Sequence, residues 1–132
     1  MVVLMKILPL LALLAPALAG PTEIICETSD ASPSTEDVTA VINQFNGDAS
    51  DKTCAQQNNC CSHCTTCGSA GSAKIAICGE TAGGIGGIPG IKHNAIAGWI
   101  NELQQKCLSN GKAGGRYVIG GATNWEVELS HS

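Results

Sequence analysis

Apolar residues recur with a helical period in the stretch from Ser32 to Gly47, SPSTEDVTAVINQFNG. The apolar side chains fall on one face of a helix, and they are Val38, Val41, Ile42 and Phe45. Ser34 can cap the first turn, and Asp37 three residues later completes a variant of the capping box. Gly47 can end the helix, so the pattern predicts a helix that stops near this residue and buries one face.

A second helical period starts at Asn94 or a near neighbour and stops before Gly111. Strands are predicted at residues 22–28 (TEIICET), 73–79 (AKIAICG), 116–121 (RYVIGG) and 124–131 (NWEVELSH). In the second strand Ile75 and Ile77 point one way, and Lys74, Ala76 and Cys78 point the other. The second helix is expected to bury Ile96, Trp99, Ile100, Leu103 and Cys107.

The order of these elements is strand, helix, strand, helix, strand, strand. It predicts an α+β fold: a small disulfide-rich α/β sandwich with two helices packed on one face of an about four-stranded, mainly antiparallel sheet. Residues 48–72 show no periodicity, so we expect a long loop held by disulfides. Residues 83–90 are predicted to form a glycine-rich connection.

The N-terminus has the pattern of a secretory leader. One charge, Lys6, precedes an apolar run, and Ala17-Leu18-Ala19 forms a cleavage box of small residues. We therefore expect residues 1–19 to be a signal peptide and residues 20–132 to form a single cysteine-rich, extracellular domain. The alternative of an uncleaved anchor is disfavoured because the apolar run is short for a membrane span.

All eight cysteines lie in the expected mature chain. In an oxidising compartment they predict four disulfides whose pairing the sequence leaves open. The positions are Cys26, Cys54, Cys60, Cys61, Cys64, Cys67, Cys78 and Cys107. A zinc site at Cys61, Cys64 and Cys67 with His63 is the alternative, but a second ligand pair elsewhere in the chain is missing. Adjacent Cys60 and Cys61 are expected to bond to different partners.

The net charge and the lack of known catalytic and phosphate-binding motifs exclude several classes of function. The chain carries a formal net charge of −4, which does not suit binding to nucleic acid or to an anionic membrane. The run at residues 83–90 lacks the third glycine and the Lys-Ser/Thr pair of phosphate-binding loops, so we expect no nucleotide cofactor. Because the cysteines are expected to form disulfides, we also expect no bound metal. No serine lies in a nucleophile elbow, and three scattered histidines are more typical of a solvated surface than of a catalytic site.

Lys74 is the candidate binding residue, because it interrupts an otherwise apolar strand beside the cysteine-rich segment. A lysine on a rigid strand can present a charged group to a partner. The alternative is an ordinary solvent-facing lysine.

Several motifs together resemble the fungal and viral killer-toxin superfamily. They are AKIAICG, GGIGGIPGIK, the helix AIAGWINELQQKC, GGRYVIG and the terminal WEVELS. The KP-four-like killer toxins are the most similar group. The Ecp-two-like necrosis-inducing effectors of plant-pathogenic fungi are also similar, through STEDVTAVINQF, Gly114–Arg116 and Asn124-Trp125.

The resemblance implies a disulfide-rich α/β sandwich secreted by a fungus, which acts without catalysis as a toxin or virulence effector on host plant or competing fungal cells. For the KP-four-like toxins it implies inhibition of calcium channels and an important strand lysine, to which Lys74 corresponds. Lys74 stands four residues before Cys78, whereas the family strand is shorter, and the acidic net charge also differs from those toxins. An apoplastic or cell-wall glycan-binding or structural protein, and a small secreted hydrolase, are the alternatives.

Overall fold

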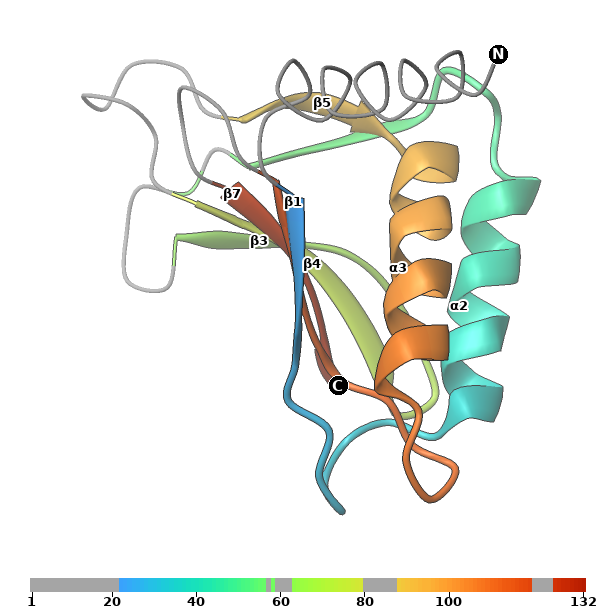
Figure 1. The fold of residues 1–132 in the computed structure, drawn as a ribbon. Helices are drawn as coiled ribbons and strands as arrows, with labels where there is room; N and C mark the ends of the chain where they lie inside the picture. The colour runs from blue at the N-terminus through green and yellow to red at the C-terminus, as the bar shows by residue number, and fades with distance from the viewer. Residues whose placement is uncertain (1–21, 57, 59–62, 80–87, 120–124) are drawn as a thin grey trace, which may run out of the picture.

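A computed structural model describes residues 22–56, 58, 63–79, 88–119 and 125–132 (Figure 1). The expected signal peptide, Cys60, Cys61 and most of the glycine-rich run lie outside these residues. The elements follow in the order β1 (Thr22–Cys26), α2 (Thr35–Gly47), β2 (Thr53–Gln56), β3 (Cys64–Ala70), β4 (Ala73–Gly79), β5 (Ile88–Lys92), α3 (His93–Cys107), β6 (Gly115–Ile119) and β7 (Trp125–His131).

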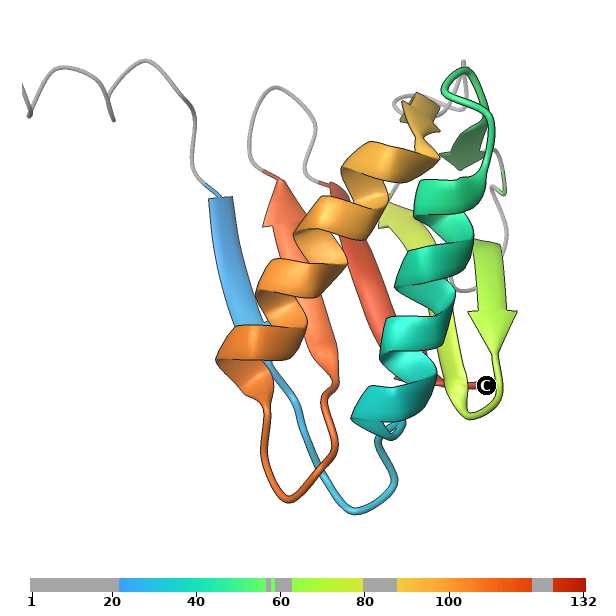
Figure 2. The same cartoon turned by 90° about the vertical axis from the view of Figure 1, so that its right-hand side faces the viewer.

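Five of the strands form one antiparallel sheet in the order β1-β6-β7-β4-β3. Helices α2 and α3 lie side by side on one face of this sheet, which confirms the predicted α+β architecture (Figure 2). The sheet is larger than the about four strands predicted, and β2 and β5 form a further two-stranded antiparallel sheet.

The core lies between the two helices and the sheet. The four predicted apolar residues of α2 are all buried, as are Ile75 and Ile77 of β4. Trp99 of α3 is only half-buried, and it stacks on Tyr117 with ring centroids 5.8 Å apart. The fully buried large side chains of α3, β4 and β7 include Ile96, Ile100, Leu103, Ile75, Ile77, Val127 and Leu129.

The prediction of one long loop at residues 48–72 was wrong, because β2 and β3 lie within it. These strands have few large apolar residues: β2 buries Cys54 and Gln56, and β3 is a half-buried edge strand with a bulge between Thr66 and Gly68. Cysteine and glutamine therefore take inward positions that aliphatic residues usually hold, and the bulge breaks the alternation.

The glycine-rich connection was also only partly predicted, since β5 begins at Ile88 within it. A proline and a glycine in this strand disfavoured it at the sequence level. Gly90 allows a close approach to β2, because an added Cβ would lie 2.8 Å from the Thr53 Oγ1 atom.

The start of α2 is held by a network that differs in part from the predicted capping box. The Ser34 hydroxyl accepts from the Asp37 backbone N–H at 3.2 Å, as expected. The Asp37 carboxylate instead accepts from the backbone N–H and the hydroxyl of Ser72, at 2.8 and 2.6 Å. These bonds tie the helix start to the β3–β4 turn and lower the pKa of Asp37, the Ser72 hydroxyl contributing most.

Among the helices that the structure describes, none is both long and apolar enough to cross a membrane.

Candidate functional site

Three disulfides connect the described cysteines. Cys26 of β1 bonds to Cys107 at the end of α3, Cys54 of β2 to Cys67 of β3, and Cys64 of β3 to Cys78 of β4. These pairs support the disulfide framework predicted for six of the eight positions. Because Cys64 and Cys67 are both oxidised to cystine, the thiolates that the zinc alternative required are absent there.

The candidate site lies on the face of the five-stranded sheet opposite α2 and α3, which we call the outer face. Strand register places Lys74 of β4 there, between Ser69 of β3 and Ser130 of β7. The same register places Ala76 beside Glu128, and Cys78 beside Glu126, on this face. Lys74 therefore lies opposite Ile75 and Ile77, on the side that the alternation predicted.

Lys74 differs from the other cation of this face in its partners. Its side chain is half-buried, and within the described part of the chain it has neither an ion pair nor a hydrogen bond. The two residues opposite it on the neighbouring strands are serines, so no carboxylate faces it directly across the sheet. The positive charge of Lys74 is thus available to another molecule.

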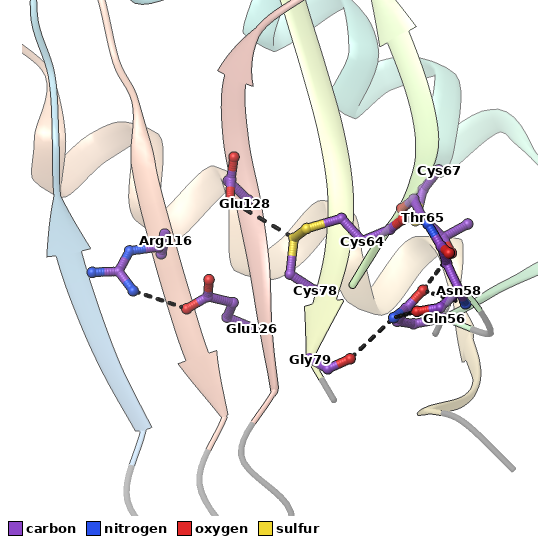
Figure 3. The surroundings of a disulfide bond; sticks show 10 residues. All are labelled: Gln56, Asn58, Cys64, Thr65, Cys67, Cys78, Gly79, Arg116, Glu126 and Glu128. Atoms are coloured by element: carbon purple, nitrogen blue, oxygen red, sulfur yellow. Dashed lines mark hydrogen bonds and ion pairs between the residues drawn. A yellow bond between two sulfur atoms is a disulfide. The ribbon is translucent and has the colours of Figure 1, made fainter. Parts of the chain in front are cut away.

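Arg116 of β6, by contrast, is held by two carboxylates. Its Nη1 donates to Glu126 at 3.1 Å (Figure 3), and its Nε donates to Glu27, also at 3.1 Å. Burial lowers the pKa of Arg116, but the charges and hydrogen bonds of Glu126 and Glu27 outweigh burial, so the pKa is raised overall. The carboxylates already neutralise this guanidinium, which leaves Lys74, among the residues that the structure describes, as the cation with an unused charge on this face.

The Cys64–Cys78 disulfide lies on the outer face beside Glu128, whose Oε2 is 3.7 Å from the Cys78 Sγ atom (Figure 3). An oxidised sulfur has no proton to donate, so the two atoms touch without a hydrogen bond. The disulfide crosslinks the strand that carries Lys74 to the sheet edge. It therefore holds the backbone of the candidate site in a fixed register.

A buried glutamine that sequence reasoning missed secures the same end of the sheet. Gln56 is fully buried, and its Nε2 donates to the carbonyls of Asn58 and Gly79 at 2.8 and 3.0 Å. Its Oε1 accepts from the Asn58 N–H and the Thr65 hydroxyl, at 2.9 and 2.7 Å (Figure 3). All four hydrogen-bonding positions of the amide are used, so Gln56 joins β2 to β3 and to the end of β4.

The sequence suggested that the three histidines lie on a solvated surface, but one of them is buried. His93, the first residue of α3, is only 5% exposed and stacks on the Phe45 ring with centroids 4.2 Å apart. Its Nδ1 lies 2.7 Å from the Asp48 Oδ2 atom. His63 is half-buried with a positive φ of 53°, whereas His131 is exposed. The described parts of the structure place no serine hydroxyl in a hydrogen bond with any of the three.

Comparison of the chain with models of known protein families, and with curated proteins, found no match. The outer face and its interactions therefore carry the functional argument.

Proposed function

We propose that this protein is a secreted, disulfide-stabilised, killer-toxin-like effector that binds a target on host plant or competing fungal cells. Lys74 is the central cationic residue of the binding surface, and its unpaired charge is the observation that carries the proposal. The ligand chemistry is a carboxylate or another anionic group on the target. An ion channel is the target class that the killer-toxin resemblance suggests.

Rigidity supports a role in recognition. Strand β4 pairs with β7 along its whole length and with β3 from Ala73 to Cys78, and the Cys64–Cys78 disulfide fixes the second pairing. A side chain on such a strand loses little backbone freedom when a partner binds, so more of the interaction energy appears as affinity. The glycan-binding alternative gains no support, because Trp99 packs on both Tyr117 and Trp125 while Phe45 stacks on His93.

The proposal is tested by applying the purified protein to plant cells and to competing fungi, and by measuring growth inhibition and calcium uptake. Lys74→Ala should lower potency about tenfold, because the variant cannot form the charged interaction with the target. Lys92→Ala removes the same charge from an exposed position on β5 and should leave potency unchanged. Circular dichroism and thermal unfolding should show that both variants retain the fold.

Equal potency of the wild type and Lys74→Ala would reject the outer face as the binding surface. A protein with its disulfides formed that affects neither cell type would reject the effector proposal itself.

A further inference from the structure

The carboxylate of Glu128 lies against the Cys64–Cys78 disulfide on the outer face (Figure 3). Glu128 is half-buried, and within the described residues it has no ion pair. Arg116 lies directly across from it on β6, but that guanidinium is held by two other carboxylates. A full negative charge therefore stands beside the disulfide without a cation to neutralise it.

We propose that Glu128 protects the Cys64–Cys78 disulfide from thiol–disulfide exchange, so that thiols of other molecules reduce this crosslink slowly. The attacking species in exchange is a thiolate, and the reaction passes negative charge to the leaving sulfur. A fixed carboxylate beside the disulfide repels both. The proposal concerns the crosslink of the strand that carries Lys74, and it does not depend on the proposed target of that residue.

Exposure directs the attacking thiolate to Cys64. The Cys64 side chain is half-buried, whereas Cys78 is only 5% exposed. A thiolate that reaches the Cys64 Sγ atom forms a new S–S bond there while the bond between Cys64 and Cys78 breaks. The sulfur of the incoming thiol is thereby oxidised to a mixed disulfide, and the electron pair of the broken bond leaves on the Cys78 Sγ atom as a thiolate. A second thiolate then releases Cys64 as a thiolate and forms the disulfide of the reductant.

The leaving sulfur is the atom that Glu128 touches. The Glu128 Oε2 atom lies 3.7 Å from the Cys78 Sγ atom, so exchange creates a second negative charge at this distance from the first. Repulsion between two unit charges about 4 Å apart slows a reaction about fivefold even with the screening of bulk water. Because Cys78 is buried, less water screens this pair, and about fivefold is a lower bound.

The other carboxylates of the outer face lack this effect. Glu126 lies directly opposite Cys78 on β7, but its carboxylate is turned towards Arg116, which donates to it at 3.1 Å (Figure 3). Glu23 lies on the same face of β1, level with Cys78 but three strands away. The spacing of strands puts it about 14 Å from Cys78, beyond the Debye length of about 8 Å at physiological salt. Glu128 is therefore the carboxylate expected to act on this disulfide.

The test measures exchange in the full oxidised protein with two thiols of opposite charge, the anionic mercaptoethanesulfonate and the cationic cysteamine. Released cysteines are blocked with N-ethylmaleimide at intervals, and mass spectrometry of the peptides gives the rate at each disulfide. Each rate is divided by the rate of the same thiol with uncharged hydroxyethyl disulfide, which removes the intrinsic reactivity of the thiol. On this scale, the anionic thiol should react with Cys64–Cys78 of the wild type at least about fivefold more slowly than the cationic thiol.

Two variants isolate the charge. Glu128→Gln keeps the size of the side chain, and it should accelerate reaction of the anionic thiol with Cys64–Cys78 about fivefold and that of the cationic thiol by less than about twofold. Glu23→Gln removes the same charge from the same face and should change neither rate. The Cys26–Cys107 disulfide, which joins β1 to α3 on the helix side, is the internal control and should keep its rates. In 1 M salt, where the Debye length is about 3 Å, the acceleration should fall below about twofold.

Three results would each overturn the proposal: no acceleration by Glu128→Gln, equal acceleration of the two thiols, or the same acceleration by Glu23→Gln. Equal acceleration that persists in high salt would show that the substitution loosens the strands instead of removing repulsion. If Glu128→Gln does not fold, the wild type decides alone. Its ratio of cationic to anionic rate must then be larger at Cys64–Cys78 than at Cys26–Cys107, and an equal ratio would reject the role of Glu128.

Discussion

Removal of the Cys26–Cys107 disulfide should destabilise the fold more than removal of Cys64–Cys78. The first bridge spans 81 residues of sequence and the second spans 14. Chain entropy of the unfolded state then gives about 4.5 kcal/mol for the long crosslink and about 3 kcal/mol for the short one. The double alanine variants of the two pairs should therefore differ by about 1.5 kcal/mol in their free energies of unfolding.

The measurement is equilibrium unfolding in urea without reductant, on the wild type and the two double alanine variants. Burial works against the expected order: Cys107 and Cys78 are both buried, but Cys26 is exposed whereas Cys64 is half-buried. Alanine substitution therefore removes more buried contacts at Cys64–Cys78 than at Cys26–Cys107. Packing alone would make the Cys64–Cys78 variant the less stable one, so the expected order can arise only from loop closure. If the Cys64–Cys78 variant proves the less stable of the two, local packing rather than loop closure determines the contribution of these disulfides.

Two further perturbations test the polar networks. Gln56→Ala removes a fully buried amide and leaves the partly buried Gly79 carbonyl without this donor, so it should cost about 1–3 kcal/mol in urea unfolding. Gln44→Ala, on the exposed face of α2, is the control, and an equal effect of both substitutions would reject the network. In the fold the pKa of Asp37 lies below its ordinary value of 3.8. The ionised carboxylate therefore stabilises the fold fully above pH 3.8, and this stabilisation is lost as the pH falls through the lower pKa of the folded state. Wild-type melting temperature should therefore fall more steeply below about pH 4 than that of Asp37→Asn, and parallel profiles would contradict the assignment.

The elements with strong periodicity were predictable from the sequence. Helix α2 buries Val38, Val41, Ile42 and Phe45 as expected, and β4 spans the residues predicted for it. These segments place large apolar side chains at the spacing of the element that buries them, so local pattern and tertiary packing agree. The face on which Lys74 lies follows from the same alternation.

The remaining elements depend on interactions between distant residues, which a local pattern does not encode. Strand β3 packs its Gly68 directly under the Phe45 ring of α2, where an added Cβ would lie 2.5 Å from Cε1. A glycine at that position disfavours a strand on propensity, although the close approach requires it. The satisfied amide of Gln56, the paired charges of Arg116 and the edge position of β1 likewise follow only from strand order and register.

The Cys26–Cys107 bridge also determines how the chain responds to proteolysis. It encloses every element from α2 to α3, so one peptide bond cut anywhere between these two cysteines leaves two fragments that are still covalently joined. The nicked molecule would migrate as a single species on a non-reducing gel and separate into two only after reduction. Long-range strand pairings such as β1 with β6 would remain intramolecular after the cut, so the nicked protein can keep its surfaces in a protease-rich environment.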